Sequence, residues 1–198
     1  MKADAIKVAR ALFQEKGADG TSMDDVAAAL GVSKPLVYQH FSGKQSLLEA
    51  VFDAAARDVR LDWIVEAAEL EIPFDRFLFE TGTACAEFVN QTKTIDAYQL
   101  ILREGLRQPG LRAAFVSHVG RPIVLNMRSI ILSAIEKEEC RDLEPRIVQR
   151  MISAPLYLVM SERAVFGATT FPPEEAAAFF KESYASLIDR LCLKRSSF

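Results

Sequence analysis

Residues 21–44, TSMDDVAAALGVSKPLVYQHFSGK, predict two short helices joined by a tight turn. Ser22 and Asp25 have the spacing of a capping box, which starts a helix because each side chain reaches the backbone N–H of the other residue. Gly31 stands where the chain must turn sharply, since glycine adopts a left-handed backbone conformation without steric cost. Ser33 is a favourable N-cap for the second helix. This order of caps and turn predicts a helix-turn-helix.

The two sides of the second helix differ in character. At about 100° per residue, Val37 and Phe41 share one side and are predicted to be buried. The other side presents polar and apolar side chains together, which is typical of a helix that lies in the major groove of DNA. Gln39 can pair with a base edge there, and Leu36 or Pro35 can touch a thymine methyl group. The side chains at the margins of this helix that could reach phosphates are Tyr38, His40 and Lys44.

Residues 2–50 resemble the N-terminal domain of TetR/AcrR-type transcriptional regulators. The likeness rests on the spaced signature LFxxKGxxxTSxxDVAxxxGVSKPxxYxHFxxKxxLL, which residues 12–48 fit. The resemblance implies a three-helix DNA-binding head, a larger all-helical body that binds a small molecule, and a homodimer. The chain departs from many relatives in carrying Asp24 and Asp25 where they have a basic residue that reaches DNA. The DNA contacts that the resemblance implies, mostly to the backbone, come from Thr21 or Ser22, Lys34, Tyr38, His40 and Lys44.

The sequence thus predicts an all-α fold with two domains. Residues 1–46 are predicted to form an N-terminal three-helix helix-turn-helix head that binds DNA, and residues 47–198 a larger helical body for ligand binding and dimerisation. The predicted DNA-binding residues are Thr21, Ser22, Ser33, Lys34, Pro35, Leu36, Tyr38, Gln39, His40 and Lys44.

Charge limits the kind of DNA binding that this head can perform. The chain has 198 residues and a formal net charge of −3 at pH 7, and residues 1–50 carry six basic and six acidic side chains. A strong non-specific nucleic-acid binder normally shows a basic patch. A neutral head instead favours a specific dimer that makes few phosphate contacts and binds random DNA weakly.

The rest of the chain has the pattern of helices separated by short polar breaks. Pro122 is predicted to break or kink one of these helices and Pro155 to bend another, because proline removes an i→i−4 hydrogen bond and crowds the preceding turn. Besides the helix-turn-helix, the predicted helices cover residues 3–16, about 43–63, 75–90, 94–106, 111–137, 146–167 and 173–193.

The last two predicted helices carry too much apolar surface for one small body. The simplest use of that surface is a four-helix bundle with a second subunit, and the alternative is that both helices are central in the body. Two heads about 34–36 Å apart would read successive major grooves of a palindromic operator. The predicted dimer-interface residues are Met151, Leu158, Phe166, Phe180, Tyr184, Leu187, Ile188 and Leu191.

A small-molecule pocket is predicted in the body, between residues 74 and 166. Apolar side chains with a few isolated polar groups are the usual lining of such pockets, although an ordinary core has the same composition. The candidate ligand-binding residues are Phe88, Tyr98, Leu102, Phe115, His118, Asn126, Met127, Tyr157 and Met160.

The three cysteines are far apart in the sequence and match no disulfide framework or metal-binding spacing. Cys85 and Cys192 fall in apolar helical patterns and are predicted to be core residues. Cys140 lies in a charged stretch and is predicted to be an exposed thiol. No signal peptide or membrane-spanning apolar run is visible, which favours a cytoplasmic location.

No catalytic constellation stands out in the sequence. We find no Gly-rich phosphate loop, zinc spacing or nucleophile elbow, so the chain is predicted to be no enzyme and to need no cofactor or metal. The predicted function is a ligand-responsive transcriptional regulator, most simply a repressor, which a small hydrophobic or amphipathic effector releases from double-stranded operator DNA. The alternative is an all-α module that binds a small molecule or a protein without binding DNA.

Overall fold

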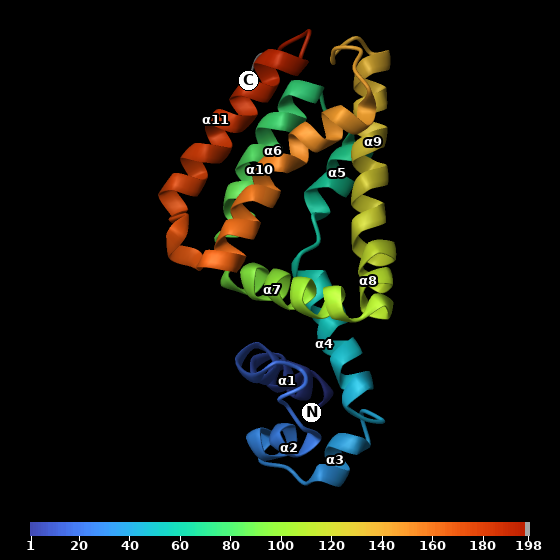
Figure 1. Ribbon diagram of the computed structural model, residues 1–198. Helices are drawn as coiled ribbons and strands as arrows, with labels where there is room; N and C mark the ends of the chain where they lie inside the picture. The colour runs from blue at the N-terminus through green and yellow to red at the C-terminus, as the bar shows by residue number, and fades with distance from the viewer. Residues whose placement is uncertain (197–198) are drawn as a thin grey trace. The chain divides into compact units, whose positions relative to one another are not determined.

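The computed structural model, which describes residues 1–196, is built from helices joined by short connections (Figure 1). In chain order these are α1 (Lys2–Lys16), α2 (Met23–Leu30), α3 (Lys34–Tyr38), α4 (Lys44–Asp58), α5 (Asp62–Leu70), α6 (Phe74–Val89), α7 (Thr92–Arg107), α8 (Pro109–Phe115), α9 (Arg121–Glu136), α10 (Pro145–Phe166) and α11 (Pro173–Leu191). A π-helical turn, Val116–Gly120, joins α8 to α9. Over the described residues, the one extended pairing is an isolated antiparallel bridge between Cys140 and Cys192. The predicted all-α fold is confirmed.

The chain packs as two compact units. The first unit comprises Met1–Val59 and Asp96–Val116, and the second comprises Arg60–Ile95 and the chain from Ser117 onward. α7 therefore begins in the second unit and ends in the first, and the π-helical turn lies where the chain passes back. Packing divides the chain differently from the functional boundary predicted after residue 46, which stays a prediction.

The first unit holds α1 to α4, the C-terminal part of α7, and α8. Its core is made of apolar side chains that the sequence spaces at helical intervals, and each is at most 1% exposed. They are Phe13 of α1, Val26 of α2, Val37 of α3, and Leu47 and Phe52 of α4. Burial of one such side chain contributes roughly 1.5–3 kcal/mol to folding, so these few residues hold the three N-terminal helices against α4.

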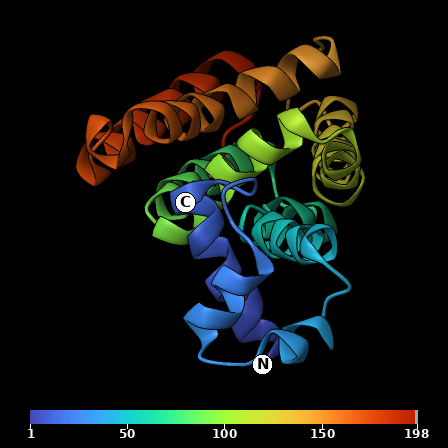
Figure 2. The ribbon, with the colours of Figure 1, turned by 60° about the horizontal axis from the view of Figure 1, so that its bottom comes forward.

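The second unit is organised around α6, which packs along α11 and also contacts α10 (Figure 1, Figure 2). Gly82 permits the close approach of α6 and α11, because a Cβ at this position would lie 3.0 Å from the ring of Tyr184. The hydroxyl of Tyr184 donates to the carbonyl oxygen of Ile152 at 2.8 Å. Helices α6, α10 and α11 thus meet at one buried tyrosine, and burial raises its pKa.

Two predicted helices differ in detail from the observed ones, and the bend predicted at Pro155 in a third stays a prediction. The helix predicted to run towards Trp63 ends at Asp58, and Trp63 lies in α5. Pro122 stands in the first turn of α9, where its missing N–H costs little, and the predicted break takes the form of the π-helical turn before it. Pro155 lies inside α10, which continues through it. No described helix combines the length and apolar character that a bilayer span needs.

Candidate nucleic-acid interface

The helix-turn-helix has the caps that the sequence predicts. The Oγ of Ser22 accepts the N–H of Asp25 at 3.1 Å, and the N–H of Ser22 donates to Oδ2 of Asp25 at 2.7 Å. Hydrogen bonds from the hydroxyl and the N–H of Ser22 hold the pKa of the Asp25 carboxyl below its ordinary value. At the other end of α2, Gly31 has a φ of 68°, and its N–H bonds to the last turn of the helix. Both ends of α2 are therefore fixed by local sequence.

α3 buries one side and exposes the other, as predicted. Val37 is fully buried and Phe41 is 3% exposed, so both anchor the helix from behind. On the outer side, Tyr38 is 43% exposed. The other predicted contacts on this side are Ser33, Lys34, Pro35, Gln39 and His40, which are exposed, and Leu36, which is half-buried. This outer side offers base-reading and phosphate-binding side chains together.

Lys34 is paired with an acidic neighbour that sequence reasoning did not assign to it. Its Nζ lies 2.9 Å from Oδ1 of Asp24, and both side chains are exposed. The hydrogen bond and the negative charge of Asp24 raise the pKa of Lys34. Because a DNA phosphate would compete with Asp24 for the same ammonium group, this pair opposes any phosphate contact by Lys34.

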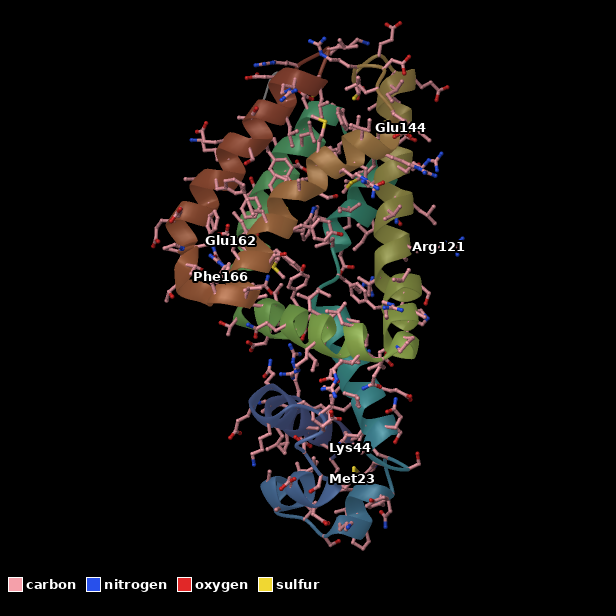
Figure 3. The ribbon with its side chains drawn as sticks, in the orientation of Figure 1. Met23, Lys44, Arg121, Glu144, Glu162 and Phe166 are labelled. Carbon is pink, nitrogen blue, oxygen red and sulfur yellow. The ribbon has the colours of Figure 1, made fainter. Side chains whose placement is uncertain are left out.

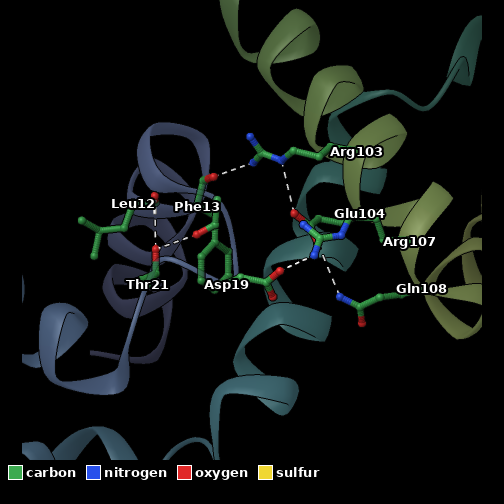
Figure 4. A network of polar contacts seen from close by, with 9 residues as sticks. Leu12, Phe13, Asp19, Thr21, Arg103, Glu104, Arg107 and Gln108 are labelled. Carbon is green, nitrogen blue, oxygen red and sulfur yellow. Dashed lines mark hydrogen bonds and ion pairs between the residues drawn. The ribbon is translucent and has the colours of Figure 1, made fainter.

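A polar network in the first unit ties the α1–α2 turn to α7 (Figure 4). Arg107 forms an ion pair with Asp19, and Arg103 donates to the carbonyl oxygen of Phe13. Lys44, the first residue of α4 (Figure 3), donates its Nζ to the carbonyl oxygen of Asp19 at 3.1 Å. Because an ammonium group has three N–H donors, Lys44 can keep this bond and still reach a phosphate.

The prediction that Thr21 contacts DNA is wrong. Thr21 is 2% exposed, and its hydroxyl donates to the carbonyl oxygen of Gly17 at 2.9 Å. Ser22 is exposed, but the capping box occupies its hydroxyl. Thr21 therefore fastens the end of α1 to the start of α2. The burial of Thr21 depends on how α1 packs against the α1–α2 turn, and a local capping pattern gives no information on this packing.

Lys2 is a candidate that sequence reasoning missed. Its Nζ lies 5.9 Å from the ring centroid of Phe41, in a cation–π arrangement that brings an exposed cation of α1 to the end of α3. The two residues are far apart in the sequence, so no local motif signals the contact.

The predicted ligand-binding residues are divided between the two units. Tyr98, Leu102 and Phe115 belong to the first unit, and the other six, which are Phe88, His118, Asn126, Met127, Tyr157 and Met160, belong to the second. Among these six, Phe88, Met127 and Met160 are buried, whereas His118 and Tyr157 are exposed. Their role in ligand binding stays a prediction.

A pocket of about 90 Å³ lies elsewhere in the second unit, among α5, the start of α6 and α9. Its lining includes Ala67, Ile72 and Ser133, together with Glu71 and Lys137, whose Oε2 and Nζ are 3.3 Å apart. None of the predicted ligand-binding residues lines it. Because ligand pockets usually measure about 300–1,000 Å³, this one is too small for the predicted effector.

Half of the predicted dimer-interface residues are core residues of the second unit. Those on the buried side of α11 are Phe180, Tyr184, Leu187 and Leu191. Their assignment to a dimer interface is wrong, because this side of α11 packs within the chain, against α6 and α10. Leu158 and Phe166 on α10 are exposed, while Met151 and Ile188 are half-buried, and these four stay predictions.

Cys140 is not the exposed thiol that its charged neighbours predicted. It is 2% exposed, and burial raises the pKa of its thiol to about 11. The reason is that the loop after α9 pairs with the end of α11 through the backbone. Cys192, predicted to be in the core, is partly exposed.

The observed features define a helix-turn-helix head on an all-helical chain. Residues 5–51 match the model of a family described as bacterial regulatory proteins, tetR family. Over 49 residues the chain is 45% identical to the biofilm operon icaADBC HTH-type negative transcriptional regulator IcaR of Staphylococcus aureus, a match that covers 25% of this chain and 26% of that one. The chain thus matches about a quarter of the length of this curated relative.

Solved structures share the fold over nearly the whole chain. A TetR family transcriptional regulator from Pseudomonas syringae pv. tomato str. DC3000 superposes with a TM-score of 0.72 at 18% identity, covering 98% of this chain and 97% of that one. The transcriptional regulator FadR from Bacillus subtilis, solved in complex with stearoyl-CoA, gives a TM-score of 0.66 at 15% identity and covers 95% and 98%. These matches show that the chain has the fold of these regulators over nearly its whole length, and the likeness to the tetR family model covers residues 5–51.

Proposed function

We propose that this protein is a homodimeric transcriptional regulator that binds a palindromic DNA operator through α3 of each subunit. The observation that carries the proposal is the two-sidedness of α3. Val37 and Phe41 are buried behind it, while Pro35, Tyr38 and Gln39 face outward. A helix of this kind fits the major groove, with Gln39 reading a base edge and the flanking cations on phosphates.

We further propose that the regulator is a cytoplasmic repressor which a small hydrophobic or amphipathic effector releases from DNA. IcaR, which shares the head sequence, is described as a negative regulator. FadR, which shares the fold, was solved with stearoyl-CoA, an amphipathic molecule. Both likenesses support this form of the proposal.

In the proposed mechanism, the effector shifts a population of conformations. Two heads must be about 34–36 Å apart to enter successive major grooves on one side of DNA. A second conformation holds the heads at a spacing that does not fit DNA. An effector that prefers this conformation by about 1–3 kcal/mol weakens operator binding roughly 5–150-fold, and the operator must weaken effector binding by the same factor. The chain passes between the two units after Val59, within α7 and at the π-helical turn, so the coupling has three covalent routes.

The first experiment is a titration of fluorescein-labelled duplex DNA from the region flanking the protein's own gene, followed by anisotropy at several salt concentrations. We expect a specific complex whose affinity falls as salt rises, because phosphate contacts release counterions. A flat titration at low salt would instead favour the alternative, a helical binding module without DNA.

Three variants then separate phosphate contacts from base reading. Lys44→Ala should weaken binding to all sequences alike and reduce the salt slope of the dimer by about 2, one phosphate contact for each head, whereas Gln39→Ala should relax the preference at particular base pairs. Lys181→Ala is the matched control, since it removes the same charge from an exposed position on α11. If Gln39→Ala and Lys44→Ala behave alike, the assignment of the two sides of α3 is wrong.

A further inference from the structure

Cys140 and Cys192 lie directly opposite each other in the second unit. They are the two members of the antiparallel bridge between the loop after α9 and the end of α11. The N–H of Arg141 donates to the carbonyl oxygen of Leu191, and the N–H of Leu193 donates to that of Glu139, both at 2.8 Å. These bonds flank the cysteine pair on both sides and do not join its members.

This pattern identifies Cys140 and Cys192 as a non-hydrogen-bonded pair. In such a pair the Cα atoms are about 4.5 Å apart and the two side chains leave the same face. Disulfides span Cα separations of about 4.4–6.8 Å. The backbone therefore holds the two thiols in an arrangement that a disulfide can join without a large movement.

Both partners of the pair are fixed before any bond forms. On one side, the N–H groups of Glu139 and Cys140 donate to the carbonyl oxygen of Ala134 in α9, at 2.8 and 3.0 Å. On the other side, the N–H of Cys192 donates to the carbonyl oxygen of Ile188 at 3.0 Å. The segment that follows α11 is held as well, because Nζ of Lys194 donates to the carbonyl oxygen of Lys137 at 2.8 Å.

We propose that Cys140 and Cys192 form a reversible intramolecular disulfide when the protein meets hydrogen peroxide. Cys192 is partly exposed and Cys140 is buried, so the oxidant reaches Cys192 first. The thiolate of Cys192 attacks a peroxide oxygen and becomes a sulfenic acid, while the other oxygen leaves as water after taking up a proton. The thiol of Cys140 then displaces the sulfenic hydroxyl as a second water. In total, two thiols and one hydrogen peroxide give one disulfide and two waters, and a dithiol reductant reverses the change.

The reactivity of the pair should depend on pH. Burial raises the pKa of Cys140 to about 11 and that of Cys192 to about 12. Since the thiolate is the reacting species, we expect the oxidation rate to rise roughly tenfold for each pH unit between about 7 and 9. Both thiols are therefore mostly protonated at neutral pH, and we expect their oxidation to be slow there.

The disulfide would close a loop that contains all of α10 and α11. A crosslink over a long loop stabilises the folded state chiefly by restricting the unfolded chain. We expect the melting temperature of the oxidised protein to rise by roughly 5–10 °C. The rise should vanish after dithiothreitol treatment.

The test uses the full chain, treated with hydrogen peroxide, quenched with catalase, denatured and alkylated. We expect one of the three thiols to remain free, a chain lighter by two hydrogen atoms before alkylation, and a peptide map that links Cys140 to Cys192. Cys192→Ser should abolish the crosslink and the thermal shift. Cys85→Ser is the matched control and should keep both, because the Sγ of Cys85 faces the hydroxyl of Tyr184 at 3.6 Å.

Several results would overturn the proposal. They are three free thiols after prolonged oxidation, a disulfide between two chains, a link that includes Cys85, or oxygen added to Cys192 while Cys140 stays free. The wild-type peptide map decides between these results even if Cys192→Ser does not fold. None of them bears on DNA binding, which the anisotropy experiment tests separately.

Discussion

At the scale of single residues, the ion pair between Asp24 and Lys34 limits the phosphate contact that is predicted for Lys34. The ion pair between them must open before Lys34 meets a phosphate, and Asp24 must then recruit a cation from solution. In Asp24→Asn this requirement disappears. We expect binding to all DNA sequences to tighten roughly two- to fivefold, since an exposed pair is weak. The salt slope of the dimer should become steeper by about 2, because each of its two heads releases about one more ion.

Glu15→Gln is the matched control for Asp24→Asn. It removes the same charge from an exposed position of α1 in the same head. If both variants tighten binding equally in the anisotropy titration, the effect is one of overall charge, and the pairing of Asp24 with Lys34 has no special role.

A second residue-scale prediction concerns the capping box and pH. The pKa of Asp25 lies below its ordinary value of 3.8 because Ser22 donates to its carboxylate. A carboxyl group whose pKa is lowered by folding stabilises the fold fully above its unfolded pKa and loses that effect as pH falls through the folded pKa. In Ser22→Ala we expect the pKa of Asp25, measured by NMR titration, to move up towards 3.8. An unchanged pKa would show that the hydroxyl of Ser22 is not the cause.

Local sequence accounts for the residues of this interface that act on their immediate neighbours. The capping box, the turn at Gly31 and the burial of Val37 follow from patterns within one or two helical turns. Thr21 and Cys140 were misplaced because their burial depends on other helices, α1 in one case and the end of α11 in the other. A pattern of neighbouring residue types contains no information on such contacts.

At the scale of helices, the contact between α6 and α11 depends on the absence of a side chain at Gly82. A Cβ there would lie 3.0–3.1 Å from atoms of Tyr184, which is tighter than ordinary packing allows. We expect Gly82→Ala to lower the free energy of unfolding by about 1–3 kcal/mol, the usual cost of overpacking. Urea denaturation followed by circular dichroism measures this change.

Gly120→Ala is the opposite case in the same unit. Gly120 has a helical φ of −64°, and a Cβ there would meet nothing within 4 Å. Alanine should therefore stabilise the protein by roughly 0.5–1 kcal/mol, because it reduces the freedom of the unfolded chain. Equal effects of the two substitutions would contradict the close approach of α6 to Tyr184.

Helix ends could be predicted well from the sequence, but the partners of each helix could not. Proline, glycine and capping residues mark ends locally, which is why the bounds of α1, α6 and α10 agree with the predicted ones to within two residues. The side of α11 that carries Phe180 and Tyr184 was assigned to a second subunit because an apolar stripe does not identify the surface that covers it. The structure covers that stripe with α6 and α10 of the same chain.

At the scale of the whole molecule, a neutral head makes dimerisation essential for the proposed function. With six basic and six acidic side chains in residues 1–50, one head has no excess positive charge to bind DNA alone. Two linked heads bind far more tightly, because the second contact is made at a high effective concentration. The affinity for the operator should therefore report on the dimer as much as on α3.

The apolar surface that remains for the proposed dimerisation includes Leu158 and Phe166 of α10, which are 45% and 69% exposed. Figure 3 labels Phe166 near the end of α10. We expect Phe166→Asp to convert the dimer to a monomer in sedimentation velocity experiments and to weaken operator binding roughly 100-fold or more, through the loss of the linked second head. Leu70→Asp is the matched control, since Leu70 is 73% exposed on α5 of the same unit and should leave both measurements unchanged. If the Phe166→Asp protein remains dimeric and keeps its operator affinity, the exposed end of α10 is not part of the interface. In that case α10 and α11 are central helices of a single body.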